Sequence, residues 1–568
     1  MLLIAQLPPP LPELRSSEVI SGDRMSIEGQ RLDASWAWQG RSSSRPERLW
    51  LPLNVLEARL GFRRSRADGN EQLEWYGQRQ ELQSFPTRTL GDEVGLEVAS
   101  WLNSLGVTLR RQGNNLSLEL PTARLQQLRQ GKGSTAGRLV LDIDQPVFVQ
   151  RRGNDLLLNL RSDQRQQNTL RSLGLMPRQV GSALTLRGQA TNLQSLTLAG
   201  PWRVVLDGIK PATASGRPTR SQGLALSDPA ITALIRRGLI VERRTIRVGV
   251  KPLEILRAGG DLPRLGLSLT PLAMAGSQQG LRFLPQLSQP AGALVAVNGG
   301  FFNRIKQLPL GALRRNGQWL SGPILNRGVI AWGANRPLAF GRLRLDQALQ
   351  VDNGRRWGLG FLNSGYVQKG LSRYTSAWGP FYRSLSGREQ AILIRAGRVI
   401  AQYDNSQLSR GVPLPQGSDL VVARGGAPLP AGTGERARVE MRSSNNLGEM
   451  PNVLGGGPLL IQGGQVVLNG RAEGFSPGFL SQTAPRTVIG QGKGGIWMLA
   501  IRGVGSSPTL LETSLAMQQL GMRDALNLDG GSSTTLVAAG RSLINGSGSP
   551  PRIHNGLGLV PQRALPLW

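Results

Sequence analysis

The sequence contains no cysteine, which excludes disulfides, thiolate nucleophiles and thiolate metal sites. Histidine is almost absent too, since His554 is the only one among 568 residues. We therefore do not expect a zinc site, because a single imidazole cannot complete the usual ligand set. If a metal is bound, it should be a hard cation such as Ca²⁺ or Mg²⁺, held by carboxylate and carbonyl oxygens. The sequence leaves open whether any cofactor is present.

Long apolar runs are also lacking. No stretch approaches the ~18 consecutive apolar residues of a membrane helix, so we expect no transmembrane segment. Residues 1–6, followed by Leu-Pro-Pro-Pro, are too short for a secretory signal but are similar to the end of one. We therefore expect a start site assigned downstream of a signal peptide, and a periplasmic or secreted protein. A cytosolic leader is the alternative.

Lysine and acidic residues are scarce relative to arginine. Only six of the 67 basic residues are lysine, so 61 are arginine, and with 36 acidic residues the net charge is +31. The planar guanidinium matches a phosphate, so the excess favours anionic polymers or phosphate groups as partners. A codon bias toward arginine would give the same composition. Because aromatic residues make up 5% and no DNA-binding motif occurs, nucleic acid is not an expected partner.

Glycine and proline, by contrast, are abundant, with 74 and 36 residues spread along the chain. This usage is typical of many short strands joined by turns, and a chain of this length normally forms several domains. We therefore predict the α+β class: a β-rich multidomain chain with small β-rich modules before a C-terminal domain of mixed α/β structure.

Local patterns suggest where these domains divide. Residues 51–62 and 96–107 each read as an amphipathic helix ending in Leu-Gly, followed by a strand, a turn and a strand. Residues 138–142 and 203–207 alternate like strands, and residues 210–223 gather Pro, Gly, Ser and Thr like a linker. The predicted division is a leader at 1–30, a small α+β repeat at 31–120, a β-rich module at 121–209, a linker at 210–228 and a C-terminal domain at 229–562.

Two glycine clusters in the C-terminal part are candidate ligand contacts. An apolar run ends at Asn298 and Gly299, where glycine would let the backbone approach a ligand and asparagine could donate and accept hydrogen bonds. Gly455, Gly456 and Gly457 could expose their N–H groups as an anion-binding concavity. A tight turn and a bulge between strands are the respective alternatives.

Charged residues follow in two further segments. Arg486 comes directly after a proline that fixes the backbone, which suits a bidentate phosphate contact. Asp529 ends an apolar strand and precedes glycines and hydroxyls, including Ser532 and Ser533. Such a carboxylate can act as acid or base or hold a cation, while the hydroxyls orient an oxyanion. Each could instead belong to an ordinary turn or surface.

Taken in order, the clusters NGGFF, GGGP, PRT, NLDGGSST and HNGLG make residues 244–560 resemble the phosphodiester glycosidase family. The first N-terminal module is similar to a stalk-type domain, and the second to the AMIN domain that attaches enzymes to the cell envelope. The resemblance implies an exported hydrolase that cleaves an N-acetylglucosamine-type sugar-1-phosphodiester in an envelope or extracellular glycan. The N-terminal modules would then contact peptidoglycan, or would be generic hairpins. A non-catalytic glycan-binding or scaffold protein with the same fold is the alternative function.

The resemblance also assigns roles to residues. It implies that Asp529 activates water or holds a cation, that Arg486 contacts phosphate, and that Glu473 is a second carboxylate unless it is a surface residue. The motif positions implied to bind substrate are Asn298, Gly299, Gly455, Gly456, Gly457, Thr487, Ser532, Ser533 and Asn555.

The sequence departs from the family pattern at two points. Relatives commonly have histidine where this chain has Ala484, and a third glycine where it has Ser532. His554 could compensate for the missing histidine, although a structural role is the preferred interpretation.

Overall fold

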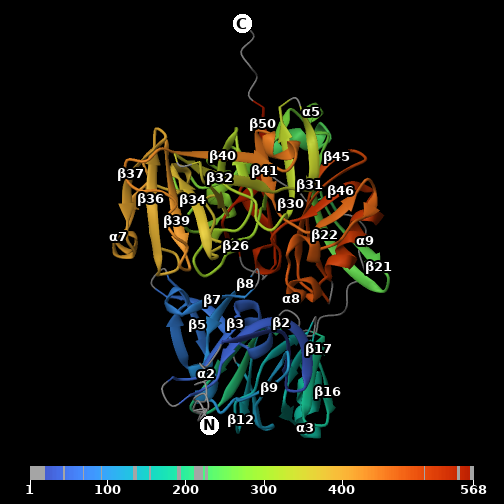
Figure 1. The fold of residues 1–568 in the computed structure, drawn as a ribbon. Helices are drawn as coiled ribbons and strands as arrows, with labels where there is room; N and C mark the ends of the chain where they lie inside the picture. Colours follow the sequence, from blue (N-terminus) through green and yellow to red (C-terminus); the bar gives the residue numbers. More distant parts are fainter. Residues whose placement is uncertain are drawn as a thin grey trace, which may run out of the picture.

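The computed structural model contains two halves that are stacked on one another. Strands up to β19 (Arg203–Asp207) form the lower, blue-to-teal half of Figure 1, and β21 (Ile240–Val248) onward forms the upper half. Strands account for 51% and helices for 15%, so the predicted β-rich architecture is confirmed, while the α+β arrangement stays a prediction. The described residues are 19–42, 45–67, 70–90, 93–131, 137–152, 155–188, 193–209, 222–223, 228–334, 336–352, 354–503, 506–546 and 550–562. In these ranges no helix has the length and apolar character needed to cross a membrane.

The first unit, residues 20–120, is built on a seven-stranded sheet. In spatial order its strands are β7 (Thr87–Leu90), β8 (Glu93–Glu97), β3 (Arg48–Pro52), β2 (Gln30–Gln39), β1 (Ile20–Ile27), β10 (Asn115–Glu119) and β9 (Thr108–Gln112). A second, three-stranded sheet holds β4 (Arg63–Ala67), β5 (Asn70–Trp75) and β6 (Gln78–Glu81). β1 lies between β2 and β10, so the sheet begins before the predicted boundary at residue 31. Only Met25 and Ile27 of β1 are fully buried, an alternation too short to predict a strand.

Both helices predicted for this unit are present but shorter than expected. The first consists of α1 (Leu53–Val55) and a π-helical turn, Leu56–Leu60, and the second is α2 (Ala99–Ser104). The apolar residues at the start of each predicted helix belong instead to β3 and β8. Backbone pairing between these two strands takes up those residues.

In the second unit, the described residues between 123 and 209 form two sheets and one helix, α3 (Gln164–Ser172). The strands of its five-stranded sheet lie in the order β15 (Leu160–Arg161), β11 (Ala123–Gln130), β12 (Arg138–Ile143), β19 and β18 (Gln194–Leu198). Those of its four-stranded sheet lie in the order β13 (Gln150–Arg152), β14 (Asp155–Leu158), β17 (Ala183–Gly188) and β16 (Leu175–Val180). The Tyr76 hydroxyl joins the two units, because it donates to the Val147 carbonyl and accepts from the Val147 amide, each at 2.9 Å. The predicted linker at 210–228 lies almost entirely outside the described residues.

Two facing sheets form the centre of the upper half. The eight-stranded sheet runs β20 (Gln222–Gly223), β21, β22 (Lys251–Gly260), β45 (Gly495–Gly503), β44 (Arg486–Gly492), β46 (Met522–Asn527), β42 (Leu459–Gln462) and β43 (Gln465–Val466). The five-stranded sheet runs β23 (Leu267–Leu272), β50 (Gly556–Pro561), β25 (Val295–Asn298), β47 (Thr535–Ala538) and β48 (Arg541–Asn545).

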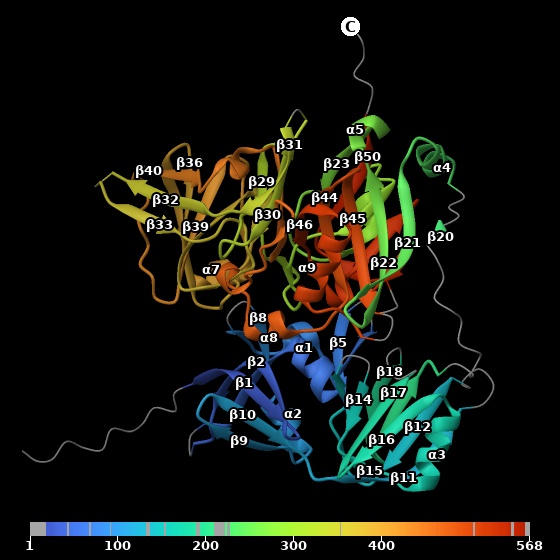
Figure 2. The same ribbon diagram turned by 90° about the vertical axis from the view of Figure 1, so that its right-hand side faces the viewer.

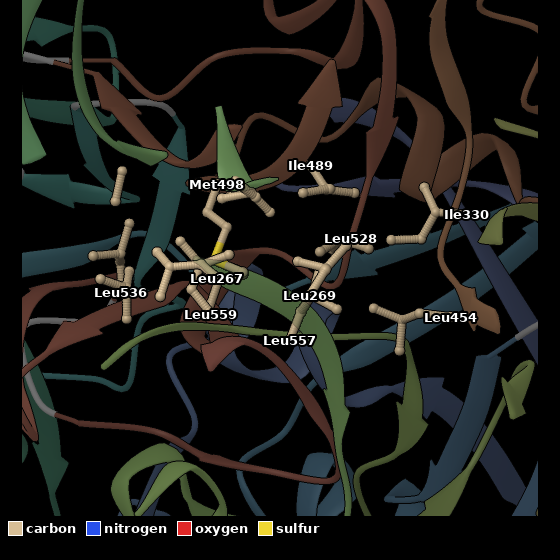
Figure 3. Packing of buried hydrophobic residues seen from close by; sticks show 14 of the residues in the cluster. Leu267, Leu269, Ile330, Leu454, Ile489, Met498, Leu528, Leu536, Leu557 and Leu559 are labelled. Atoms are coloured by element: carbon tan, nitrogen blue, oxygen red, sulfur yellow. The ribbon is translucent and has the colours of Figure 1, made fainter. Parts of the chain in front are cut away.

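The main hydrophobic core lies between these sheets (Figure 3). Met498 of β45 joins Leu557 of β50 in this core, whereas the neighbouring Leu499 lies on the other face, in a cluster that includes residues of α9 (Leu510–Gln519). Successive strand residues point to opposite faces, so both faces of the large sheet are covered. Leu528, just beyond β46, also belongs to the core and anchors the segment that continues to Asp529.

Three further sheets occupy the other side of the upper half. The first sheet has the strand order β29 (Gln318–Ser321), β28 (Leu313–Arg315), β41 (Asn452–Gly455), β30 (Gly328–Gly333) and β31 (Arg336–Arg342). The second has the order β33 (Arg356–Leu359), β32 (Leu345–Val351) and β40 (Ala437–Ser443). The third has the order β34 (Gly370–Thr375), β39 (Ser418–Arg424), β36 (Glu389–Arg395) and β37 (Arg398–Tyr403). A buried ion pair joins Arg424 to Glu389 at 2.7 Å. The hydroxyls of Tyr374 and Tyr382 accept from the same guanidinium at 2.9 and 2.6 Å.

Candidate active site

Strand ends from both central sheets bring the motif residues together. β25 ends at Asn298, β44 begins at Arg486, and β50 begins immediately after Asn555. β46 ends two residues before Asp529. The predicted buried strands before Asn298 and Asp529 are therefore present, and their polar residues meet at one edge of the core.

The Asn298 side chain holds this edge together through hydrogen bonds. Its Nδ2 donates to the Asp529 carbonyl at 2.6 Å, and its Oδ1 accepts from Thr487 Oγ1 at 2.7 Å and from the Thr535 amide at 3.0 Å. Asn298 and Thr487 are at most 1% exposed. Both side chains therefore position the backbone around Asp529, and neither reaches the surface as a predicted substrate contact would.

Asp529 supplies the carboxylate of the site. Its amide donates to the Gly299 carbonyl at 3.0 Å, which fixes the backbone. Burial raises the pKa of its carboxyl, opposed by the charge of Arg304 and by hydrogen bonds from Ser533 and Gly530. The buried Oδ2 accepts no hydrogen bond from any residue in the described ranges. An acceptor held without a donor can take a proton or orient water.

Arg304 is the residue of this site that the sequence did not single out. Its guanidinium donates to Ser532 Oγ at 2.6 Å and Ser533 Oγ at 3.1 Å, and its Nη2 lies 3.7 Å from Asp529 Oδ2. It therefore joins the predicted hydroxyls to the predicted acid. Nothing separates it in the sequence from sixty other arginines, although it stands directly after the NGGFFN motif.

Arg486 lies deeper than a surface phosphate contact would. It is 1% exposed, its Nη2 donates to the Gln482 carbonyl, and its Nε is buried with no acceptor among the described residues. Burial lowers the pKa of its guanidinium to about 10, with the charge of Asp529 opposing this shift. Arg486 can thus stabilise charge on Asp529 from below, while the more exposed Arg304 is better placed for a phosphate.

Glu473, predicted to be a second carboxylate of the site or else a surface residue, does not lie at the surface, and its described contacts are structural. It is fully buried, and its oxygens accept from the amides of Gly328 and Leu459 at 2.8 and 3.0 Å. Arg342 Nε also donates to it at 3.2 Å. Buried carboxylates need such partners, and here the partners fasten β30 and β42.

The three consecutive glycines also do not form an anion-binding concavity. The amides of Gly455, Gly456 and Gly457 donate to the carbonyls of Ala312, Gly328 and Asn527 at 2.7, 2.9 and 2.7 Å. Glycine is needed here for close approach, because a Cβ on Gly456 would lie 2.4 Å from the Asn527 carbonyl oxygen. The segment therefore supports the end of β46 from below.

A further part of the site lies where β25 meets the start of β50, at Gly299, His554 and Asn555. A Cβ on Gly299 would lie 2.1 Å from Asn555 Oδ1, which accepts from the Gly300 amide at 2.8 Å. His554 Nε2 donates to the Gln278 carbonyl at 2.9 Å, and burial lowers its pKa to about 4. His554 is therefore neutral and structural, and does not replace the histidine missing at the buried Ala484.

The side chains around Asp529 do not make a multidentate cation site. Within the described ranges no three His, Asp or Glu side chains group in a way that could hold a metal ion. Ca²⁺ and Mg²⁺ sites usually combine several oxygen ligands, whereas Asp529 faces guanidinium groups.

Comparisons with known proteins place this site in context. Residues 379–560 match the family model of phosphodiester glycosidases, a range that includes Arg486, Asp529 and Ser532 but not Asn298 or Arg304. No curated protein matches the chain. A hypothetical protein from Synechocystis is 31% identical, with 96% of this chain and 99% of that chain covered and a TM-score of 0.56. The catalytic domain of zebrafish N-acetylglucosamine-1-phosphodiester alpha-N-acetylglucosaminidase, auto-inhibited by its pro-peptide, is 14% identical over 60% of this chain and 87% of that one, with a TM-score of 0.31.

Proposed function

Because residues 379–560 match the phosphodiester glycosidase family, we propose that this chain hydrolyses the bond between the anomeric carbon of an N-acetylglucosamine-type sugar and a bridging phosphate. The observation that carries the proposal is the pairing of one buried carboxylate, Asp529, with Arg304 and a row of hydroxyls. The substrate class would be a phosphate-linked glycan of the cell envelope or extracellular space, which the net charge of +31 would attract.

The chemistry of a phosphodiester explains why one carboxylate is enough. Ordinary glycosides need both a proton donor for the leaving oxygen and a second carboxylate. A phosphodiester is already a weak base, so it can leave with little protonation. The site then has to stabilise an oxocarbenium-like centre and an anionic leaving group, and guanidinium groups are suited to the second task.

In this mechanism each side chain has a defined task. Arg304 donates to the phosphate oxygens as negative charge develops on the leaving group. Asp529, ionised, accepts a proton from the attacking water at its Oδ2, which no other described residue occupies as a donor. Ser532 and Ser533 keep Arg304 in place, and Arg486 supports the charge of Asp529.

The direct test is release of free sugar from an N-acetylglucosamine-1-phosphodiester by the full chain. Asp529→Asn should lower kcat by about 10²- to 10⁴-fold, the usual contribution of a general acid or base. Asp524→Asn is the matched control, because Asp524 lies on β46 but contacts the Gly463 amide instead of the site. It should change kcat less than about twofold, in line with a surface substitution.

Two outcomes would contradict the proposal. Undiminished activity in Asp529→Asn would remove that residue from the mechanism. A folded but inactive parent that still retains envelope glycan in a pull-down would favour the alternative, a non-catalytic glycan-binding protein. The location outside the cytoplasm is part of the proposal too, and a secretion assay with a periplasmic reporter would test it.

A further inference from the structure

The first unit reaches the candidate active site through one side chain. Arg64 of β4 places its Nη2 3.5 Å from Ser532 Oγ, although 468 positions separate the two residues. The same hydroxyl accepts from Arg304 at 2.6 Å. Two guanidinium groups, one from each half of the molecule, therefore converge on a single neutral oxygen. Arg64 is paired with Glu57 and Arg304 lies 3.7 Å from Asp529, and the N–H groups that both arginines direct at Ser532 are also able to donate to an anion.

Arg64 is held in this position from behind. Glu57, in the π-helical turn Leu56–Leu60, accepts from Arg64 Nε at 2.5 Å, and the side chains are 24% and 30% exposed. The carboxylate holds Nε–H and so restricts the planar guanidinium, whose Nη2 lies 3.5 Å from Ser532 Oγ. The charge of Glu57 also raises the pKa of Arg64, which keeps the group charged.

Apolar and polar contacts fix the first unit against the site. Ile305, the residue after Arg304, is 3% exposed and belongs to the hydrophobic core of the first unit. On another part of the boundary, a Cβ on Gly478 of α8 (Pro477–Ser481) would lie 2.6 Å from the Asp33 carbonyl, and Figure 2 shows α8 directly against the first unit. The turn that carries Arg304 is therefore packed into the core of the first unit.

The boundary nevertheless leaves room for a ligand group. A cavity of about 420 Å³ is lined by residues of both halves, including Thr87 and Thr89 from the first unit and Asn303 and Lys306 from the turn that carries Arg304. The lining includes several hydroxyl side chains and the Asn303 amide, which can hydrogen-bond a polyhydroxylated ligand. Arg64 and Arg304 do not line this cavity themselves, but it borders the turn that carries Arg304, through Asn303 and Lys306.

We propose that Arg64 is a specificity-determining residue of the active site, which together with Arg304 binds the phosphate of the substrate. The first unit then completes a phosphate-binding site that the glycosidase domain alone does not contain. The inference rests on the proposed function and adds a role for a unit that the family match does not include. Two guanidinium groups can each donate in parallel to one phosphodiester, which favours that group over an uncharged aglycone.

The test compares two substrates and three variants in the full chain. Arg64→Ala should raise KM for an N-acetylglucosamine-1-phosphodiester by about tenfold or more, the usual effect of losing a charge-assisted hydrogen bond, with kcat little changed. KM for an uncharged aryl N-acetylglucosaminide whose aryloxide is also a weak base, and so leaves with little protonation, should stay the same. The KM of Arg64→Lys for the phosphodiester should lie between those of the parent and Arg64→Ala, because the charge remains but the planar guanidinium is lost.

Arg63→Ala is the matched control. It removes the same charge from the same strand, but neighbouring strand residues point to opposite faces. The inference would be wrong if Arg63→Ala raised KM as much as Arg64→Ala, because the effect would then come from the overall charge. It would also be wrong if Arg64→Ala raised KM for the uncharged substrate as much as for the phosphodiester, because the substitution would then disrupt the site in general.

A binding measurement separates this inference from the proposed function. N-acetylglucosamine 1-phosphate is titrated calorimetrically into Asp529→Asn with and without Arg64→Ala. About tenfold weaker binding in the double variant would support the role of Arg64 even if the parent cleaved nothing. Equal binding and equal KM would overturn it, even if the parent proved to be an active glycosidase.

Discussion

At the scale of single residues, the site holds a carboxyl group in surroundings that oppose its ionisation. Asp529 is buried, and Arg304, Ser533, Gly530 and Arg486 partly offset the cost of ionising it. Its pKa is therefore raised, which means that the native state binds this proton more tightly than the unfolded chain does. The corresponding stability is present at low pH and is lost as pH rises through the native pKa.

The pH dependence of catalysis should follow from the same shift. If ionised Asp529 activates water, kcat/KM should rise with pH along a limb that lies above the usual aspartate value of about 3.9. Ser533→Ala removes a hydrogen bond that favours the ionised form, so the limb should move further up. A pH–rate profile of parent and variant checks this. A limb at the ordinary value, or one that Ser533→Ala leaves in place, would contradict it.

A second buried charge serves stability. The Arg424 charge and the Tyr382 hydroxyl hold the pKa of Glu389 below its usual value, although burial opposes this. The stability from Glu389 is therefore present above its unfolded pKa and lost as pH falls through the native one. Arg424→Met should cost about 3–5 kcal/mol at neutral pH, because it leaves an unpaired buried carboxylate.

Urea unfolding of this variant beside the double variant Glu389→Gln/Arg424→Met provides the measurement. The double variant should have a higher free energy of unfolding than Arg424→Met, since no buried charge remains. If the single and double variants were equally destabilised at every pH, lost packing rather than the unpaired charge would be responsible.

At the scale of secondary structure elements, the site depends on how closely strands approach. Gly456 lies against the end of β46, and a Cβ there would come within 2.4 Å of the Asn527 carbonyl oxygen and 2.9 Å of Leu528 Cδ2. Gly456→Ala should therefore displace Asp529, cost about 1–3 kcal/mol and lower kcat by about tenfold or more. Gly358→Ala, where nothing lies within 4 Å of the added carbon, is the control for chemical denaturation and rate measurements. Equal effects of both substitutions would contradict this account.

The sequence was informative about elements and much less so about their partners. An apolar run followed by polar and glycine residues predicted that β25 would end at Asn298 and that a strand would end near Asp529, because local pattern decides where a strand stops. Arg304 and the burial of Glu473 depend on contacts between distant segments. Local sequence patterns do not indicate such contacts. The sequence therefore could not distinguish Arg304 from the other arginines.

At the scale of the whole molecule, the first unit should influence catalysis through its packing. Ile305 joins its core to the turn that carries Arg304. Ile305→Ala should cost about 2–5 kcal/mol as a buried truncation and should raise KM for the phosphodiester, as Arg64→Ala does. Ile235→Ala on α4 (Pro229–Arg236), where the side chain is 38% exposed, should leave both stability and KM nearly unchanged. A stable Ile305→Ala variant with unaltered KM would show that the halves act independently.

The position of β50 in the five-stranded sheet has a consequence for biosynthesis. β50 lies between β23 and β25, so neither has its β50 partner until Gly556–Pro561 has been made. At about 5–20 residues per second, a ribosome needs roughly 15 s to a minute to travel from β21 to β50. The first unit can fold on the nascent chain meanwhile, because its described hydrophobic cluster takes one residue, Ile305, from the upper half. Translation speed and chaperone supply should therefore govern the yield of the upper half far more than that of the lower one.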